Sequence, residues 1–405
     1  MMDYWIDNVR IENGYTYDND WVNGSKTDLV AVHVVTGKIA AIIPQDEFVK
    51  EHMQATYSGD GLLMLPSLTD KHVHLDKLKI GEPWTPIRPA KNIVERFEQE
   101  IPDINRLSSS MQERAEKMIA LEKQHGVTTI RSHVDIEPMT DLRHFKVIKK
   151  VAENSDIKIE IVAFPQHGLL RSQSYDLVAE ALQSGADFIG GVDPYGLDQD
   201  YKKSLGQTFE LADKYHAGVD IHVHDRNEAG TKTIKEIIRL TEYYHLQDKV
   251  FISHAFGLND FVGEERQSVF DQLAALKIHI VTSVPLDAGT IPPIMELIHA
   301  GVQVHVGNDN VNDSWSPYGN GSVQDKLARL GEMFSVNDQV GLTQLLGLVT
   351  DGKVTLDAKG NRQWPVVGEA ANFMLVDASC AAEFVARQSR VDGVRYLDEQ
   401  CNLNN

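Results

Sequence analysis

The stretch TDKHVHLDK (residues 69–77) directly follows an apolar run, GLLMLPS (61–67), and carries two histidines two positions apart. Side chains at positions i and i+2 of a β-strand point to the same face, so His72 and His74 can converge on one point. Two imidazoles directed at one point are typical of a metal site. The stretch therefore predicts a strand that ends in part of a metal centre.

Working outward from this stretch, short β-rich runs alternate with amphipathic helical stretches between about residues 62 and 309. Alternation of this kind implies βαβ units around a parallel sheet, and eight strands are the number in a (β/α)8 barrel. The eight runs are GLLMLPS (61–67), VTTIRSHVD (127–135), IKIEIVAFPQ (157–166), DFIGGVDP (187–194), GVDIHVHD (218–225), VFISHAF (250–256), IHIVTSVP (278–285) and VQVHVGND (302–309).

Both ends of the chain have a different pattern, with short strands and turn signals in LVAVHVVTGKIAAIIP (29–44), VVGEAANFMLVDA (366–378) and RVDGVRYLD (390–398). We predict an α/β fold, a TIM-like barrel with a small β-sandwich domain formed by both chain termini. The predicted boundaries are 1–61 and 355–405 for the small β domain, and 62–354 for the barrel. We expect the segment 79–100 to be a loop that shapes the pocket.

Composition excludes several classes of function. The 405 residues include 39 basic and 59 acidic side chains, a net charge of −20 with no basic stripe, so we expect no nucleic-acid partner. No segment approaches the roughly 20 apolar residues of a membrane span, so we expect no membrane partner and a cytoplasmic location. The cysteines are Cys380 and Cys401, so a metal must take its ligands from histidines and carboxylates. Homo-oligomerisation stays open.

Polar side chains gather at the carboxyl ends of the predicted strands, where a barrel of this kind carries its active site. From their spacing we assign one divalent metal ion, Zn²⁺ or Fe²⁺, because three imidazoles and one carboxylate suit both. The metal would lower the pKa of bound water to about 7 and give a hydroxide nucleophile. The predicted ligands are His72, His74, His222 and Asp309.

Two of these strand-end residues are predicted to act on the proton or the substrate. His254 would polarise the water or the substrate, and Asp309 would pass a proton to the leaving amine. Strand four ends in Asp193 and offers no lysine, so we expect one metal and no carbamylated-lysine bridge. His133 and Asp135 are expected to support the ligands.

The motifs HVHLD (72–76), HVHD (222–225), SHA (253–255) and GNDN (307–310) resemble the amidohydrolase superfamily in their order along nearly the whole chain. The segments RSHVD, AFPQHG and GNDNVNDSWSPYGNG are similar to the cytosine deaminase branch. HLDK, GGVDP, the second HVHD and the Asn-Gly of YGNG look like N-isopropylammelide isopropylaminohydrolases of that branch. The resemblance implies the same four metal ligands and hydrolytic removal of an amino or alkylamino group from a nitrogen heterocycle.

The resemblance also implies roles in substrate binding and catalysis. Gln166 matches a residue that recognises the ring amide, Trp315 matches a wall of the pocket, and Asp193 is predicted to contact substrate. Lys77, His224 and Asp225 are predicted catalytic residues, each of which could instead orient a ligand. The sequence departs from cytosine deaminase at two positions, which there carry glutamate and histidine. These are Asp225 and Asn308.

We therefore predict a metal-dependent aminohydrolase acting on a small pyrimidine- or triazine-like heterocycle by attack of metal-bound hydroxide. One alternative is an amidohydrolase that opens a cyclic amide or cleaves an N-acyl group, and another is a metal-binding protein without catalytic activity. Seven other histidines are expected to be structural, the last two filling the barrel interior: His33, His52, His144, His216, His299, His279 and His305.

Overall fold

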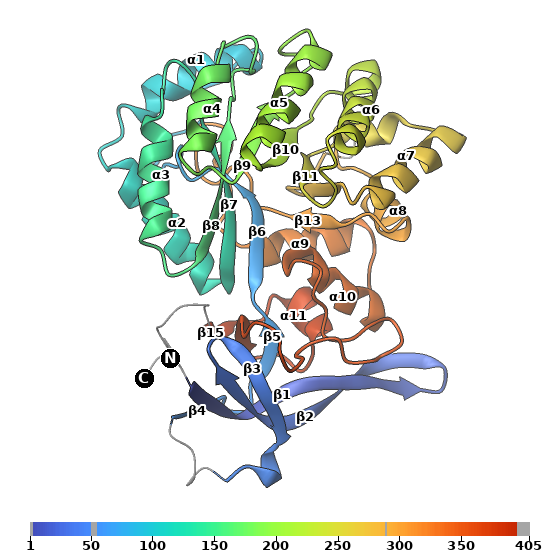
Figure 1. Cartoon of the computed structure of the whole chain (residues 1–405). Coiled ribbons are helices and arrows are strands. Elements are labelled where there is room, and N and C mark those ends of the chain that lie inside the picture. The colour runs from blue at the N-terminus through green and yellow to red at the C-terminus, as the bar shows by residue number, and fades with distance from the viewer. Residues whose placement is uncertain (1–2, 50–54, 288–289, 395–405) are drawn as a thin grey trace.

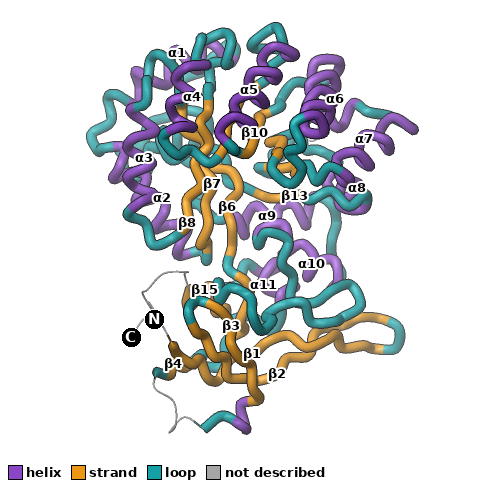
Figure 2. Tube along the Cα trace, in the orientation of Figure 1, coloured by secondary structure: helices purple, strands orange, loops and turns teal. Residues whose placement is uncertain are grey.

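A computed structural model describes residues 3–49, 55–287 and 290–394, so His52, Cys401 and the end of the predicted strand 390–398 lie outside the described residues. Eight parallel strands form one sheet in the order β13-β12-β11-β10-β9-β8-β7-β6 (Figures 1 and 2). The strands at the two ends of this order meet through a parallel bridge between Val73 and Asp309, which closes the sheet into a barrel.

The barrel strands agree with the predicted runs from the second run onward, and each observed strand begins and ends within its run. The bounds of all eight barrel strands are β6 (Leu68–Val73), β7 (Val127–Asp135), β8 (Lys158–Phe164), β9 (Phe188–Val192), β10 (Gly218–His222), β11 (Val250–Ser253), β12 (His279–Thr282) and β13 (Val304–Val306). Because helices cover the outside of the sheet, the strands are buried on both faces, as parallel sheets usually are.

The helices that connect successive strands surround the barrel (Figure 1). They are α2 (Met111–Gln124), α3 (Arg143–Glu153), α4 (Tyr175–Gln183), α5 (Tyr201–Tyr215), α6 (Asn227–Tyr243), α7 (Gly263–Ala275) and α8 (Ile294–His299). The start of α2 shows how the sequence sets a boundary. Ser110 accepts a hydrogen bond from the backbone N–H of Glu113, and the Glu113 carboxylate accepts one from the Ser110 N–H, which forms a capping box.

The first predicted strand is a correction. GLLMLPS was expected to open the barrel, but β5 (Leu63–Pro66) lies in the sheet of the termini, where it pairs with β14. The barrel begins at Leu68, after Ser67, on the strand β6 that carries His72. Both β5 and β6 are buried along their whole length. An unbroken apolar run such as GLLMLPS therefore does not show which of the two sheets it joins. The predicted domain boundaries stay a prediction.

The second sheet combines strands from both ends of the chain in the order β15-β14-β5-β1-β2-β3, with β4 paired to β1. Its further strands are β1 (Asp3–Asp18), β2 (Trp21–Val35), β3 (Lys38–Pro44), β4 (Thr56–Ser58), β14 (Phe373–Val376) and β15 (Val391–Val394), and a short 3-10 helix, η1 (Gln45–Glu47), follows β3. The predicted class is confirmed as a barrel with a separate sheet from the termini.

Several helices lie outside the predicted pattern. The C-terminal region was expected to contain only short strands, but α11 (Ala381–Arg387) lies between β14 and β15, where Ala381, Ala382, Phe384 and Val385 are buried. The segment expected as a loop contains α1 (Ile93–Ile104), which lies at the end of the barrel away from the terminal sheet (Figure 1). The others are η3 (Phe256–Asp260), α9 (Val323–Met333), α10 (Gln339–Leu345) and η4 (Leu346–Val349).

The described part of the chain has two buried apolar clusters. The larger one fills the space between the barrel strands and the helices around them, and the smaller one lies under the terminal sheet around Ile6, Val32 and Trp364. Among the described residues, no helix is both long enough and apolar enough to cross a lipid bilayer.

Candidate active site

The four predicted metal ligands come together at the carboxyl ends of three strands. His72 and His74 lie at the end of β6, and their Nε2 atoms are 3.6 and 3.4 Å from Oδ1 of Asp309. Asp309 follows β13 and donates its backbone N–H to the carbonyl oxygen of His72 at 2.6 Å. His222 ends β10, and its ring centroid is 4.5 Å from that of His72 and 5.6 Å from that of His74.

Possible ligand atoms form three overlapping groups that share His72, in each of which these atoms lie within 4.8 Å of one another. The groups are His72 with His74 and Asp309, His72 with His222 and His254, and His72 with His133 and Asp220. His72 Nε2, both ring nitrogens of His222 and His254 Nε2 are buried and have no hydrogen-bond partner among the described residues. Leaving buried polar atoms unpaired is costly, so this convergence fits residues that could hold a metal ion.

The protonation states in the site suit metal ligands. Burial lowers the pKa of His72 and of His222 well below the ordinary value, and neighbouring histidines lower it further, so both rings are neutral. Burial alone would raise the pKa of Asp309, but a hydrogen bond from His74 and the nearby imidazoles hold it well below its usual range. Neutral imidazole and ionised carboxylate are the forms that bind a metal.

His72 is oriented by a hydrogen-bond relay that the sequence analysis missed. Its Nδ1 lies 2.9 Å from the Ser253 hydroxyl oxygen, and Ser253 donates to Oδ1 of Asp220 at 2.7 Å. Asp220 precedes His222 by two positions in β10, a spacing that places both on one face and could have indicated the relay. His133, an expected supporter, packs its ring 4.1 Å from the His72 ring and makes no hydrogen bond to the described residues.

His224 and Asp193 form a pair beside the ligands. Asp193 Oδ2 lies 3.0 Å from His224 Nδ1, and Asp193 Oδ1 accepts the backbone N–H groups of His224 and Asp225 at 2.6 and 3.1 Å. Burial opposes the charge on His224, but the Asp193 carboxylate raises the pKa of His224 above its ordinary value. The Asp225 carboxylate instead accepts the N–H of Gly196 at 2.9 Å. The predicted roles of these residues stay predictions.

Lys77 and Gln166 are hydrogen-bonded to each other on the opposite side of the site. The Lys77 ammonium donates to Gln166 Oε1 at 2.7 Å and to Asp135 Oδ1 at 2.8 Å, and Lys77 is fully buried. Burial alone would lower the pKa of Lys77, but the carboxylates of Asp135 and Glu100 raise it above its ordinary value. Asp135 was expected to support a metal ligand, but in the structure its carboxylate contacts Lys77 instead.

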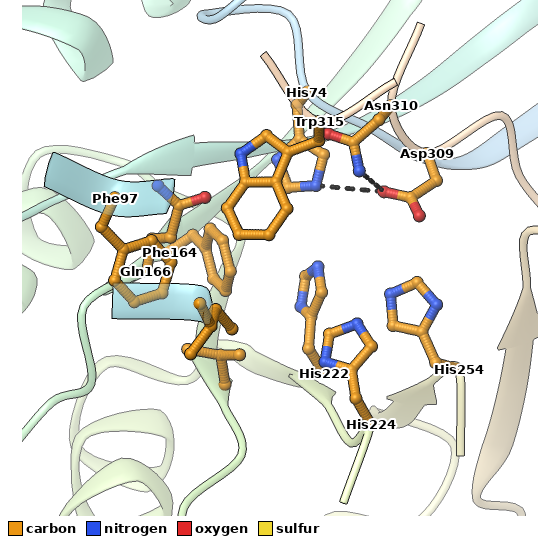
Figure 3. A pocket seen from close by; sticks show the side chains of 12 residues that line it. His74, Phe97, Phe164, Gln166, His222, His224, His254, Asp309, Asn310 and Trp315 are labelled. Atoms are coloured by element: carbon orange, nitrogen blue, oxygen red, sulfur yellow. Dashed lines mark hydrogen bonds and ion pairs between the residues drawn. The ribbon is translucent and has the colours of Figure 1, made fainter. Parts of the chain in front are cut away.

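Part of this site surrounds a cavity whose empty space, including the part that is open to solvent, is about 350 Å³. Apolar and aromatic side chains form much of its wall, and the rings of His222, His224 and His254 lie together on one side (Figure 3). The lining residues are His74, Ile93, Phe97, Phe164, Gln166, Val192, His222, His224, His254, Asp309, Asn310 and Trp315.

Asn308, one of the two departures from the cytosine deaminase pattern, lies in the loop after β13. Asn308 does not line the cavity, because its amide donates to Asp70 Oδ2 at 2.8 Å in the barrel wall. Asn310 lines the cavity instead and donates to Asp309 Oδ1 at 2.9 Å. Asp309 and His254 have positive φ angles of 60° and 66°, which is strained for residues other than glycine and is frequent at functional sites.

Comparisons with known proteins agree with this geometry. The profile of the Amidohydrolase family matches residues 105–397. A protein of Escherichia coli K12 named "Uncharacterized protein YahJ" is 38% identical over 95% of this chain and 85% of its own length. The N-isopropylammelide isopropyl amidohydrolase of Pseudomonas sp. strain ADP is 26% identical over 78% of this chain and 85% of its own length.

Among solved structures, N-isopropylammelide isopropylaminohydrolase from Burkholderia multivorans is 29% identical, covers 98% of this chain and 97% of its own, and has a TM-score of 0.85. The 5-methylcytosine deaminase from Klebsiella pneumoniae with 5-fluorocytosine shares the fold at a TM-score of 0.79, with 22% identity over 97% of this chain and 96% of its own. The family match, the relatives and the strand-end histidines lead to one conclusion: this chain belongs to the amidohydrolase family, whose members are hydrolases of carbon–nitrogen bonds.

Proposed function

We propose that the protein is a metal-dependent aminohydrolase that removes an amino or alkylamino group from a pyrimidine- or triazine-like heterocycle. The observation that carries this proposal is that His74, Asp309 and His222 each lie close to His72. Nε2 of His72 and both ring nitrogens of His222 are buried and have no hydrogen-bond partner among the described residues. The names of the relatives support the substrate class, because they include N-isopropylammelide hydrolases and a pterin deaminase of Rhizobium rhizogenes.

The four residues would hold one divalent ion, zinc or iron, since three imidazoles and a carboxylate suit both. When bound, such an ion lowers the pKa of water to about 7 and so provides a nucleophile near neutral pH. Asp309 is the strongest candidate for proton transfer, because its carboxylate lines the cavity. It would accept a proton from the attacking water and give it to the leaving nitrogen.

The other side chains of the cavity would bind and orient the ring. Gln166 and Trp315 line the cavity, and Phe97 and Phe164 supply apolar walls against a flat heterocycle. His254 and His224, with ring centroids 4.3 Å apart, would polarise the water or the substrate. Lys77, Asp193 and Asp225 would act through Gln166, His224 and Gly196, respectively.

The reaction exchanges an amine for oxygen. Water adds to the ring carbon that carries the amino group, the carbon–nitrogen bond breaks, and ammonia or an alkylamine leaves with the proton. Incubation of metal-loaded protein with cytosine, isocytosine, N-isopropylammelide and pterin should release amine from at least one compound. No release from the whole panel, with bound metal confirmed by elemental analysis, would contradict the proposal.

Product mass distinguishes the proposed reaction from the alternative hydrolysis of a cyclic amide. Ring opening adds the mass of one water molecule to the substrate, whereas deamination replaces the amine by oxygen. A cytoplasmic location and homo-oligomerisation stay predictions.

A further inference from the structure

Glu100 on helix α1 is a buried carboxylate that connects two walls of the cavity without lining the cavity itself. Its Oε1 accepts the indole N–H of Trp315 at 2.7 Å, and its Oε2 accepts an amide N–H of Gln166 at 2.6 Å. Trp315 belongs to the loop after β13, and Gln166 follows β8. One side chain therefore joins α1 to two segments that are distant in sequence.

The partners of Gln166 determine which way its amide points. Its Oε1 accepts from the Lys77 ammonium, which can only donate, and its Nε2 donates to Glu100 and, at 3.3 Å, to Asp135. A flipped amide would place its NH₂ group against the ammonium and its oxygen against a carboxylate. Both amide hydrogens are used in the observed orientation, and the oxygen keeps a free lone pair.

Glu100 also holds the apolar face of α1 at the cavity. Ile93, Phe97 and Glu100 are spaced at i, i+4 and i+7, so they lie on one face of the helix, and the first two line the cavity. The Phe97 ring lies 5.8 Å from the Trp315 indole. The long segment between β6 and α1 contains no other helix or strand, so few other elements hold α1 in place.

We propose that Glu100 is a positioning residue of the active site, whose two oxygens dock α1 against the cavity and lock the Gln166 amide with its oxygen free to accept. A role for Glu100 as a simple counterion of Lys77 would explain fewer of these contacts. Lys77 already has Asp135 at 2.8 Å, whereas Glu100 Oε2 is 3.6 Å from the ammonium. The consequence for substrate binding rests on the proposed function. The test below needs no substrate, so the two proposals can fail separately.

The substitution Glu100→Gln leaves one acceptor oxygen for two donors, so the Trp315 indole or the Gln166 amide must lose its partner. We expect the Trp315 indole resonance to shift in NMR spectra of protein labelled with ¹⁵N-tryptophan, where Trp315→Phe assigns the signal. Backbone amides of α1 should exchange with deuterium roughly tenfold faster or more, as expected for losing a buried hydrogen bond to a charged group. The matched control is Glu98→Gln, at an exposed position of the same helix, which should change neither signal.

The double variant Glu100→Gln with Gln166→Glu exchanges the two groups. The amide oxygen introduced at position 100 can accept from Trp315, its NH₂ can donate to the carboxylate introduced at position 166, and that carboxylate can still accept from Lys77. The contact of position 166 with Asp135 then needs a proton, which Asp135 can hold because burial raises its pKa to about 7. We expect the Trp315 resonance and α1 exchange to return toward wild type.

Three results would overturn the proposal: an unchanged Trp315 signal and α1 exchange in Glu100→Gln, an equal change in Glu98→Gln, or no recovery in the double variant. If Glu100→Gln alone fails to fold, the double variant decides. A folded protein with the wild-type Trp315 resonance supports the proposal, and an unfolded one contradicts it.

Discussion

Two layers of buried polar side chains lie inside the same barrel, and they differ in how their atoms are paired. The upper layer, at the carboxyl ends of the strands, consists of His72, His74, His222, His254 and Asp309. The lower layer, deeper in the barrel, consists of Arg131, Glu160, Asp220, His279 and His305. Both layers contain histidines and carboxylates, and all their residues except Asp309, which is partly exposed, are buried.

The lower layer is held mainly by contacts among its own residues and their neighbours. One ring nitrogen, His305 Nδ1, has no hydrogen-bond partner among the described residues and lies 3.7 Å from Asp351 Oδ1. Arg131 donates to Glu160 at 3.0 and 2.9 Å and to Asp220 at 3.1 Å, and its guanidinium lies 3.7 Å from the centroid of the Phe188 ring. His279 Nδ1 lies 2.9 Å from His305 Nε2, and His279 Nε2 lies 3.2 Å from Asp248. Such pairing is what a structural layer requires.

In the upper layer, ligand atoms of His72, His222 and His254 converge without hydrogen-bond partners from the described residues. The comparison teaches that burial of histidines does not by itself mark a site. The informative feature is a set of ligand atoms that approach one another and are left unpaired by the protein. This difference between the two layers can be tested by substitutions in each.

Replacing an upper-layer ligand should abolish metal binding. In His72→Ala we expect metal content to fall from about one ion per chain to background and turnover to be lost, because a site of this kind needs all its ligands. The matched control is His279→Ala in the lower layer, which should keep its metal. Elemental analysis of both proteins measures this, and a full complement of metal in His72→Ala would refute the ligand assignment.

Breaking the lower layer should cost stability. Arg131→Met leaves the carboxylates of Glu160 and Asp220 buried without their partner, so we expect the free energy of unfolding to fall by about 3–5 kcal/mol. Lys158→Met removes the exposed second partner of Glu160 and should cost less than about 1 kcal/mol. Urea unfolding measures both, and equal losses would mean that the buried pairing contributes little.

The same pairing predicts a pH dependence. Burial alone would raise the pKa of Glu160, but Arg131 and nearby lysines lower it to about 2. Because the folded pKa lies below the unfolded value, this stability is present above about pH 4.5 and is lost as the pH falls toward 2. In Glu160→Gln, the decrease in the free energy of unfolding between about pH 4.5 and 2 should be smaller than in the wild type, by up to about 3 kcal/mol. Glu98→Gln controls for removing one exposed negative charge, and equal pH slopes in the two variants would contradict the pairing.

Removing the hydrogen bond through which the lower layer supports the upper one should have the smallest effect, a loss of metal affinity. Ser253 links Asp220 to His72, so Ser253→Ala should weaken metal affinity by about 10- to 100-fold while the protein stays folded. Ser67→Ala removes a buried hydroxyl contact with Thr128 at the start of the barrel and should leave affinity unchanged. Chelator competition measures both constants, and an unchanged affinity in Ser253→Ala would remove the relay from the site.

The strand-end histidines and most barrel strands could be predicted from the sequence, because alternation and motif order are local patterns. The placement of β5 could not, since a fully buried apolar run fits either sheet. Nor could the role of Glu100, or the place of Ser253 between Asp220 and His72, because their partners depend on how α1 and β11 pack in space. His133 was expected to support a ligand through a hydrogen bond, yet in the structure its ring packs against the rings of His72 and His222 without one.

The most direct test of the central claim is anomalous diffraction from metal-loaded crystals at the absorption edge of the bound element. We predict one peak per chain, bonded to His72, His74, His222 and Asp309. A peak that is not bonded to these residues, or no peak in protein that retains turnover, would contradict the claim.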